Sequence, residues 1–200
     1  MRYSISRLLE RWAQKLAIML VKQLGWKIHN LSSPLIKQKA VIVLAPHTSN
    51  WDFFYGMLFR FSCPALPIRF AIKKEVMFFP LSYLMKALGA IPIDRSGQQL
   101  GKKQSSRVDF MVELFNKADK LLLIIAPEGT RKYVRRWKTG FYRIAEAANV
   151  PIILGYIDYA QKTMGLGPSF YPTGNIETDI AIIQDFYRPI SGKHPEQGVR

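Results

Sequence analysis

The chain has 200 residues, 48% of them hydrophobic, and its 29 Lys and Arg outnumber 14 Asp and Glu to give a net charge of +15. Such a length can bury the core of one domain or of two small ones, and such a charge favours anionic partners: nucleic acid, anionic lipid headgroups, CoA phosphates or an acidic carrier protein. The single cysteine, Cys63, excludes an internal disulfide and suits a reducing compartment.

Residues 1–38 are predicted to form a basic amphipathic helical segment that precedes the main domain, residues 39–200. Apolar side chains recur at helical spacing through residues 2–26, including Trp12 and Leu16, with Lys and Arg between them. A helix of this kind can lie in a membrane interface, or it can pack on the domain with its basic face in solvent. Both interpretations stay open.

The apolar runs are all too short to cross a bilayer, which takes roughly 20 apolar residues. Lys15 and Lys22 close off the stretch between them, and no small-residue cleavage pattern of a secretory signal follows it. We therefore expect a cytoplasmic protein that is peripheral on the inner face of the cytoplasmic membrane.

The rest of the chain alternates short apolar runs with helical patterns, which indicates an α/β domain. The runs are largely apolar rather than alternating, as expected for strands buried on both faces, and lie at residues 40–45, 68–72, 90–93, 121–126 and 151–157. Helices are predicted at residues 51–61, 74–88, 104–118 and 139–148. Residues 165–174 are predicted to be a Gly- and Pro-rich turn region, and residues 179–187 a closing helix.

Polar side chains follow three of these strands immediately. Residues 46–52 come after the first strand, Asp94 and Arg95 after the third, and residues 127–131 after the fourth. In open α/β sheets, ligands bind at the carboxyl ends of the strands, where the following loops converge. We therefore expect the three loops to form one site.

His47 and Asp52 offer the chemistry of a general base. A neutral imidazole can take a proton from an attacking hydroxyl, and a carboxylate on its other nitrogen sets the tautomer and stabilises the imidazolium. Ser49 or Asn50 can cap a helix that begins near residue 51, so that Asp52 lies in the first turn and folds back toward His47. The chain has no Gly-x-Ser-x-Gly elbow, so the substrate's own hydroxyl is the expected nucleophile.

The fourth strand is followed by groups suited to a ligand. Gly129 permits tight backbone geometry, and Arg131 offers a planar fork for phosphate. Taken alone, this loop favours a surface turn held by a structural Glu–Arg pair over a ligand site, and Arg95 is compatible with a plain surface arginine. A metal site is not indicated, because the three histidines are scattered and Cys63 has no second cysteine.

Taken together and in order, these residues resemble the 1-acylglycerol-3-phosphate (PlsC-like) acyltransferase family. That family carries His-x4-Asp, Gly-x-Ile-x-x-x-Arg, Glu-Gly-Thr-Arg and Val-Pro-Ile blocks, which stand here at residues 47–52, 89–95, 128–131 and 150–152. Four blocks in this order make a specific signal. The resemblance implies a glycerolipid-acyltransferase-like α/β fold, with a mixed, largely parallel sheet flanked by helices.

The resemblance also implies roles for the site residues. His47 deprotonates the acceptor hydroxyl, and Asp52 orients His47. Three side chains hold the acceptor headgroup: Arg95, Glu128 and Arg131. General acyl-transfer chemistry adds Gly129 and Thr130 as backbone donors to the oxyanion. The acyl donor is acyl-CoA or an acyl carrier protein, with no further cofactor, and the expected acceptor is a lysophospholipid, first of all 1-acylglycerol-3-phosphate, which becomes phosphatidic acid.

Three alternatives stand beside this interpretation. With Trp51 and the aromatic residues in 137–142, this chain has more aromatic side chains near the expected site than many members of the family. A lyso-amino-acid lipid or another lysolipid therefore stays open as the acceptor. A non-catalytic membrane-surface protein is the second alternative, although every residue that the chemistry needs is present. A nucleic-acid-binding module would suit the charge, but helix-turn-helix, zinc-finger and RNA-recognition patterns are absent, so we expect no nucleic-acid partner.

Overall fold

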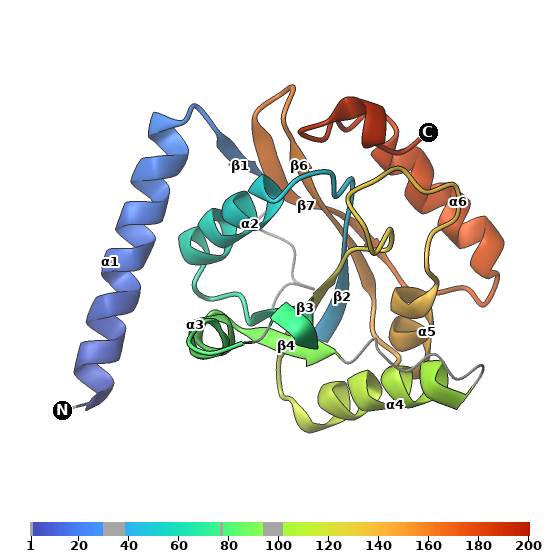
Figure 1. Cartoon of the computed structure of the whole chain (residues 1–200), viewed down its shortest axis with the longest axis horizontal. Coiled ribbons are helices and arrows are strands. Elements are labelled where there is room, and N and C mark those ends of the chain that lie inside the picture. Colours follow the sequence, from blue (N-terminus) through green and yellow to red (C-terminus); the bar gives the residue numbers. More distant parts are fainter. Residues whose placement is uncertain (1, 30–38, 77, 94–101) are drawn as a thin grey trace.

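The computed structural model describes residues 2–29, 39–76, 78–93 and 102–200, and they form a seven-stranded sheet with helices around it (Figure 1). The strands lie in the order β1-β7-β6-β2-β5-β3-β4, and every neighbouring pair is parallel except β6 and β7. Their bounds are β1 Lys27–His29, β2 Lys39–Leu44, β3 Ile68–Lys73, β4 Ala90–Ile93, β5 Leu121–Ile125, β6 Ile152–Asp158 and β7 Thr163–Phe170. The expected mixed, largely parallel α/β sheet is confirmed.

The helices are α1 Arg2–Gln23, α2 Trp51–Ser62, α3 Leu81–Ala87, α4 Lys102–Lys117, α5 Gly140–Ala147 and α6 Ile176–Tyr187, with 3-10 turns η2 Lys74–Val76 and η3 Pro195–Gln197. They bury both faces of the sheet. Val41 and Val43 of β2 pack in a cluster with α4, α5 and α6, whereas Ala40 and Ile42 pack in another with α1 and α2. Successive strand residues point to opposite faces, so strands covered on both sides are apolar without alternation.

The five predicted strands correspond to β2–β6, but β1 and β7 were not predicted. The prediction of a turn region at residues 165–174 is wrong, because β7 runs through most of it. Its glycines allow close packing instead. A Cβ on Gly165 would lie 2.4 Å from a backbone carbonyl oxygen of β1, and one on Gly167 would lie 2.6 Å from the Phe186 ring.

Two predicted helices also differ from the structure. The helix expected at residues 74–88 is divided into η2 and α3, and Pro80 stands at the N-cap of α3, where a residue without an N–H is tolerated. The last helix begins three residues earlier than expected. Its N-cap is Asn175, whose side chain accepts a hydrogen bond from the Thr178 amide at 3.2 Å.

The helix α1 packs on the domain through one side only. Ala17 and Val21 are buried against α2 and the sheet, as is Trp26 just after the helix, whereas Trp12 and Leu16 are exposed. Within the described residues, none of the helices combines the length and the apolar character of a membrane span. The strand β1 joins the main sheet, and the division of the chain at residue 38 stays a prediction.

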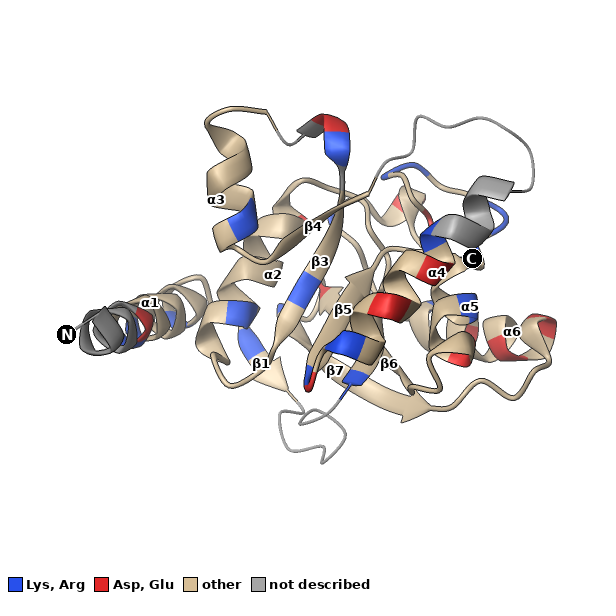
Figure 2. Ribbon diagram, turned by 90° about the horizontal axis from the view of Figure 1, so that it is seen from below, with Lys and Arg blue, Asp and Glu red and all other residues tan. Residues whose placement is uncertain are grey.

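The molecule is elongated, with α1 at one end and α6 at the other, and α3 and η2 project from one edge of the sheet (Figure 2). The loops that follow β2, β5 and β6 hold the residues of the site described next.

Candidate active site

The loop between β2 and α2 brings His47 and Asp52 together, as predicted. His47 Nδ1 lies 2.9 Å from Asp52 Oδ2, and the same oxygen accepts the backbone amides of Thr48 and Ser49 at 2.9 Å each. Asp52 lies in the first turn of α2 and folds back over the loop. Of the two expected caps, Asn50 occupies the N-cap position but its side chain makes no capping hydrogen bond. Ser49 Oγ instead accepts a hydrogen bond from the Trp51 amide at 3.2 Å.

Burial and hydrogen bonding together assign the state of this pair. Asp52 is 2% exposed and accepts four hydrogen bonds, as an ionised carboxylate can. The network therefore assigns the ring proton of His47 to Nδ1 and leaves Nε2 as the acceptor. The His47 side chain is 29% exposed, so its ring is accessible to a substrate. The geometry is that of an oriented general base.

The fourth bond to Asp52 comes from Tyr159, which follows β6 directly. Its hydroxyl donates to Asp52 Oδ1 at 2.7 Å. Burial, and then the bond to Asp52, raises the pKa of Tyr159 well above its ordinary value, so the phenol stays protonated and remains a donor.

Glu128 supports the backbone of the loop after β2. Its Oε2 accepts the His47 amide at 3.0 Å, and Oε1 lies 3.3 Å from the same nitrogen. The carboxyl is buried, and this burial raises its pKa to about 7, although the hydrogen bond from His47 opposes the shift. Glu128 therefore contacts the loop that carries His47.

Arg131 of the 128–131 loop also reaches this site. The Arg131 guanidinium donates a hydrogen bond to Asn50 Oδ1, which joins the loops after β2 and β5. Gly129 has φ +64°, in the left-handed region that favours glycine. Thr130 Oγ1 accepts the Lys132 amide at 3.4 Å. The third predicted loop, with Asp94 and Arg95, lies outside the described residues.

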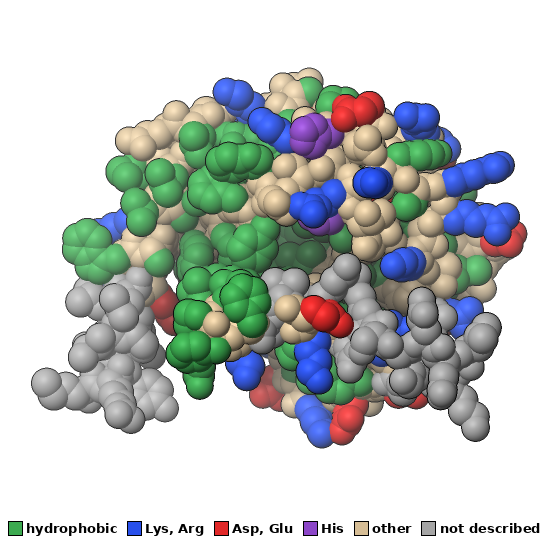
Figure 3. Space-filling view, in the orientation of Figure 1, with side chains coloured by type: hydrophobic (Ala, Val, Ile, Leu, Met, Phe, Trp, Pro, Cys, Tyr) green, Lys and Arg blue, Asp and Glu red, His purple; other side chains and the backbone are tan. Residues whose placement is uncertain are grey.

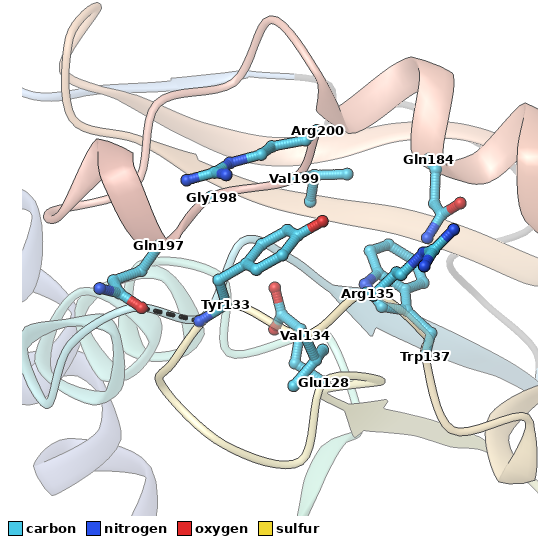
Figure 4. A pocket seen from close by; sticks show the side chains of 10 residues that line it. All are labelled: Glu128, Tyr133, Val134, Arg135, Trp137, Gln184, Gln197, Gly198, Val199 and Arg200. Carbon is cyan, nitrogen blue, oxygen red and sulfur yellow. Dashed lines mark hydrogen bonds between the residues drawn. The ribbon is translucent and has the colours of Figure 1, made fainter.

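A cavity of about 230 Å³ lies behind Glu128. Figure 4 shows the side chains that line it: Glu128, Tyr133, Val134, Arg135, Trp137, Gln184, Gln197, Gly198, Val199 and Arg200. The Tyr133 amide donates to Gln197 Oε1 at 2.7 Å and ties the loop after β5 to the last turn. Glu128 thus contacts the His47 loop on one side and this cavity on the other.

The surface of the molecule differs from one side to the other. In Figure 3, apolar side chains gather over the region of α2 and α3, cationic side chains lie on the opposite side, and the surface between them is hollowed. The exposed apolar residues of α2, of α3 and of the turn just before α3 are Trp51, Phe53, Phe54, Phe78, Phe79, Tyr83 and Leu84. Among the described residues, no three His, Cys, Asp or Glu side chains are grouped to hold a metal ion.

Comparison with known proteins agrees with this geometry. Residues 27–156, more than half of the chain, match the acyltransferase family. The chain belongs to the acyltransferase family. Its fold is similar to the crystal structure of the 1-acyl-sn-glycerophosphate (LPA) acyltransferase PlsC from Thermotoga maritima, with a TM-score of 0.62 and 17% identity over 93% of this chain and 79% of that one. No curated protein sequence matches the chain.

Sequence reasoning missed Tyr159 in this acyltransferase. The residue belongs to none of the four sequence blocks and stands 107 positions from its partner Asp52. One signal was available, because Tyr159 follows a buried strand directly, as His47 and Glu128 nearly do.

Proposed function

We propose that this acyltransferase moves a fatty acyl group from acyl-CoA or an acyl carrier protein to the free hydroxyl of a lysophospholipid. The first candidate acceptor is 1-acylglycerol-3-phosphate, which becomes phosphatidic acid. The observation that carries the proposal is the His47–Asp52 contact, with Nδ1 engaged and the ring accessible. The order of the four sequence blocks, and the activity named for the Thermotoga maritima protein of similar fold, support this choice of acceptor.

In the proposed reaction, His47 Nε2 takes the proton of the acceptor hydroxyl as the oxygen attacks the thioester carbonyl. The tetrahedral intermediate collapses, the C–S bond breaks, and the imidazolium returns the proton to the leaving thiolate. Asp52 keeps the imidazole oriented and stabilises its cationic form. The chemistry requires no covalent acyl-enzyme, since the substrate supplies the nucleophile.

The loop after β5 is proposed to hold the substrates. Gly129 and Thr130 would offer backbone N–H groups to the oxyanion, and Arg131 would pair with the acceptor phosphate. Arg95 is assigned the same role as Arg131 on the resemblance alone. For Glu128, the bond to the His47 amide favours support of the catalytic loop alongside any contact with the headgroup.

We also propose that the protein works at the cytoplasmic surface of an anionic membrane, where lipid acceptors reside. The net charge of +15 suits anionic headgroups. Trp12 and Leu16 on α1, and Phe79 and Tyr83 at α3, are more than half exposed and offer apolar contacts to such a surface.

The proposal is tested by measuring thiol release from acyl-CoA and from acyl carrier protein with a panel of lysolipids. His47→Ala should lower turnover by about 10²–10⁴ while the protein stays folded, and Asp52→Asn should also be severely impaired. His194→Ala is the matched control, because that imidazole is exposed and its backbone amide, which bonds Thr48 Oγ1 at 3.2 Å, is kept. Near wild-type turnover in folded His47→Ala would refute the assignment.

The same panel decides between acceptors. A preference for a lyso-amino-acid lipid over lysophosphatidic acid would replace the first candidate and keep the mechanism. No thiol release with any acceptor would favour the non-catalytic alternative.

A further inference from the structure

The two oxygens of Asp52 have separate partners. Oδ2 accepts the His47 ring nitrogen and two backbone amides, while Oδ1 accepts the Tyr159 hydroxyl at 2.7 Å. Because this carboxylate is almost fully buried, rotating it would leave charged oxygen atoms without donors, which is costly. The hydrogen bond from Tyr159 therefore restrains the oxygen that faces His47.

The ring of Tyr159 is itself held in place. Trp26, between α1 and β1, packs edge-on against it with 5.2 Å between centroids, and Tyr55 of α2 does the same at 5.5 Å. The backbone amide of Tyr159 donates to the Ser191 carbonyl at 2.8 Å. Lys193 Nζ lies 5.7 Å from the ring centroid. The hydroxyl is therefore positioned by contacts from three other parts of the chain.

We propose that Tyr159 is a positioning residue that acts through Asp52 to set both the orientation and the proton affinity of His47. A donor on Oδ1 draws negative charge away from Oδ2, so the imidazolium is attracted less and more of His47 is the neutral base at a given pH. Other titratable groups that face this network are Glu128 at the His47 amide, and Tyr55 and Lys193 against the Tyr159 ring. The activity readout rests on the proposed function, whereas the effect on His47 does not.

The test replaces Tyr159 by Phe, which removes one oxygen and keeps the packed ring. We expect kcat/KM to fall roughly tenfold, and the acid limb of the pH–rate profile to move to higher pH. Tyr142→Phe is the matched control, because the Tyr142 hydroxyl donates to buried Asp179 at 2.8 Å, in a pair outside the site. It should cost similar stability and leave the acid limb in place.

Titration of the histidine rings by NMR measures the effect without turnover. The chain has three histidines, and the His47 signal is assigned by its loss in His47→Gln. Tyr159→Phe should move the His47 midpoint to higher pH, and Tyr142→Phe should not. If Tyr159→Phe does not fold, Trp26→Phe, which loosens the ring and keeps the hydroxyl, should give a smaller movement in the same direction.

The proposal is overturned if the His47 titration does not move in folded Tyr159→Phe. If only Trp26→Phe folds, an unmoved titration in that variant overturns it. Equal movement in Tyr142→Phe overturns it as well. A wild-type protein that transfers no acyl group would refute the proposed function, and the NMR titration would still decide the role of Tyr159.

Discussion

The buried carboxyl of Glu128 predicts how the stability of this acyltransferase depends on pH. The residue is 6% exposed, and burial raises its pKa from 4.5 to about 7. Because the folded state holds the proton more tightly than the unfolded state, stability is greatest below the unfolded pKa and falls as pH rises toward the folded pKa. Glu128→Gln removes this ionisation and keeps an oxygen that can accept the His47 amide.

The expected size follows from the two pKa values. At 1.36 kcal/mol per pH unit, the gap between 4.5 and about 7 corresponds to about 3 kcal/mol, of which about 2.5 kcal/mol is lost between pH 5 and pH 8. Urea unfolding at both pH values should show the wild type losing this amount relative to Glu128→Gln. The comparison cancels the titration of the groups that both proteins share.

Two further variants sharpen the measurement. Glu177→Gln, at an exposed position of α6, gives the effect of removing one surface carboxylate. Glu128→Ala removes the acceptor of the His47 amide and should lower activity more than Glu128→Gln does. The free energy of unfolding of the wild type is compared with that of Glu128→Gln at each pH. If their difference is constant within about 0.5 kcal/mol from pH 5 to pH 8, burial does not hold Glu128 neutral.

Three other predictions concern the loop after β5 and α1. Gly129→Ala should cost about 1 kcal/mol of stability, because φ there is +64°; an unchanged urea midpoint would contradict this. Arg131→Ala should raise the KM for a phosphorylated acceptor and leave the KM for an acceptor without phosphate unchanged. An equal rise for both acceptors in steady-state assays would show that Arg131 has a structural role instead. Trp12→Glu with Leu16→Glu should weaken sedimentation with anionic vesicles, unlike Ile182→Glu on α6; full binding would place the membrane face elsewhere.

The buried strands were predictable from sequence because their runs are apolar and bounded by polar loops. The two that were missed lack this pattern. β1 has only three residues at the sheet edge, and β7 carries glycines that the sequence reasoning assigned to a turn. In the structure those glycines are required by close approach to β1 and to Phe186, which is a tertiary requirement with no local signature.

The contact between His47 and Asp52 was predictable for the opposite reason, since it is local. His47 and Asp52 are five residues apart, and the turn into α2 is enough to bring them together. The bond from Tyr159 to Asp52 depends on the order of the strands, which spacing does not reveal. The same holds for Glu128, whose place beside the His47 amide was not predicted.

The site therefore has a consequence for folding. His47 is bonded to a residue 81 positions farther along the chain, and Asp52 to one 107 positions farther along, so these two hydrogen bonds form only after β5 and β6 have joined β2. Contacts of such sequence separation close large loops and form slowly. During refolding, helical signal should return first, and acyl transfer should return last, as a reporter of the completed sheet.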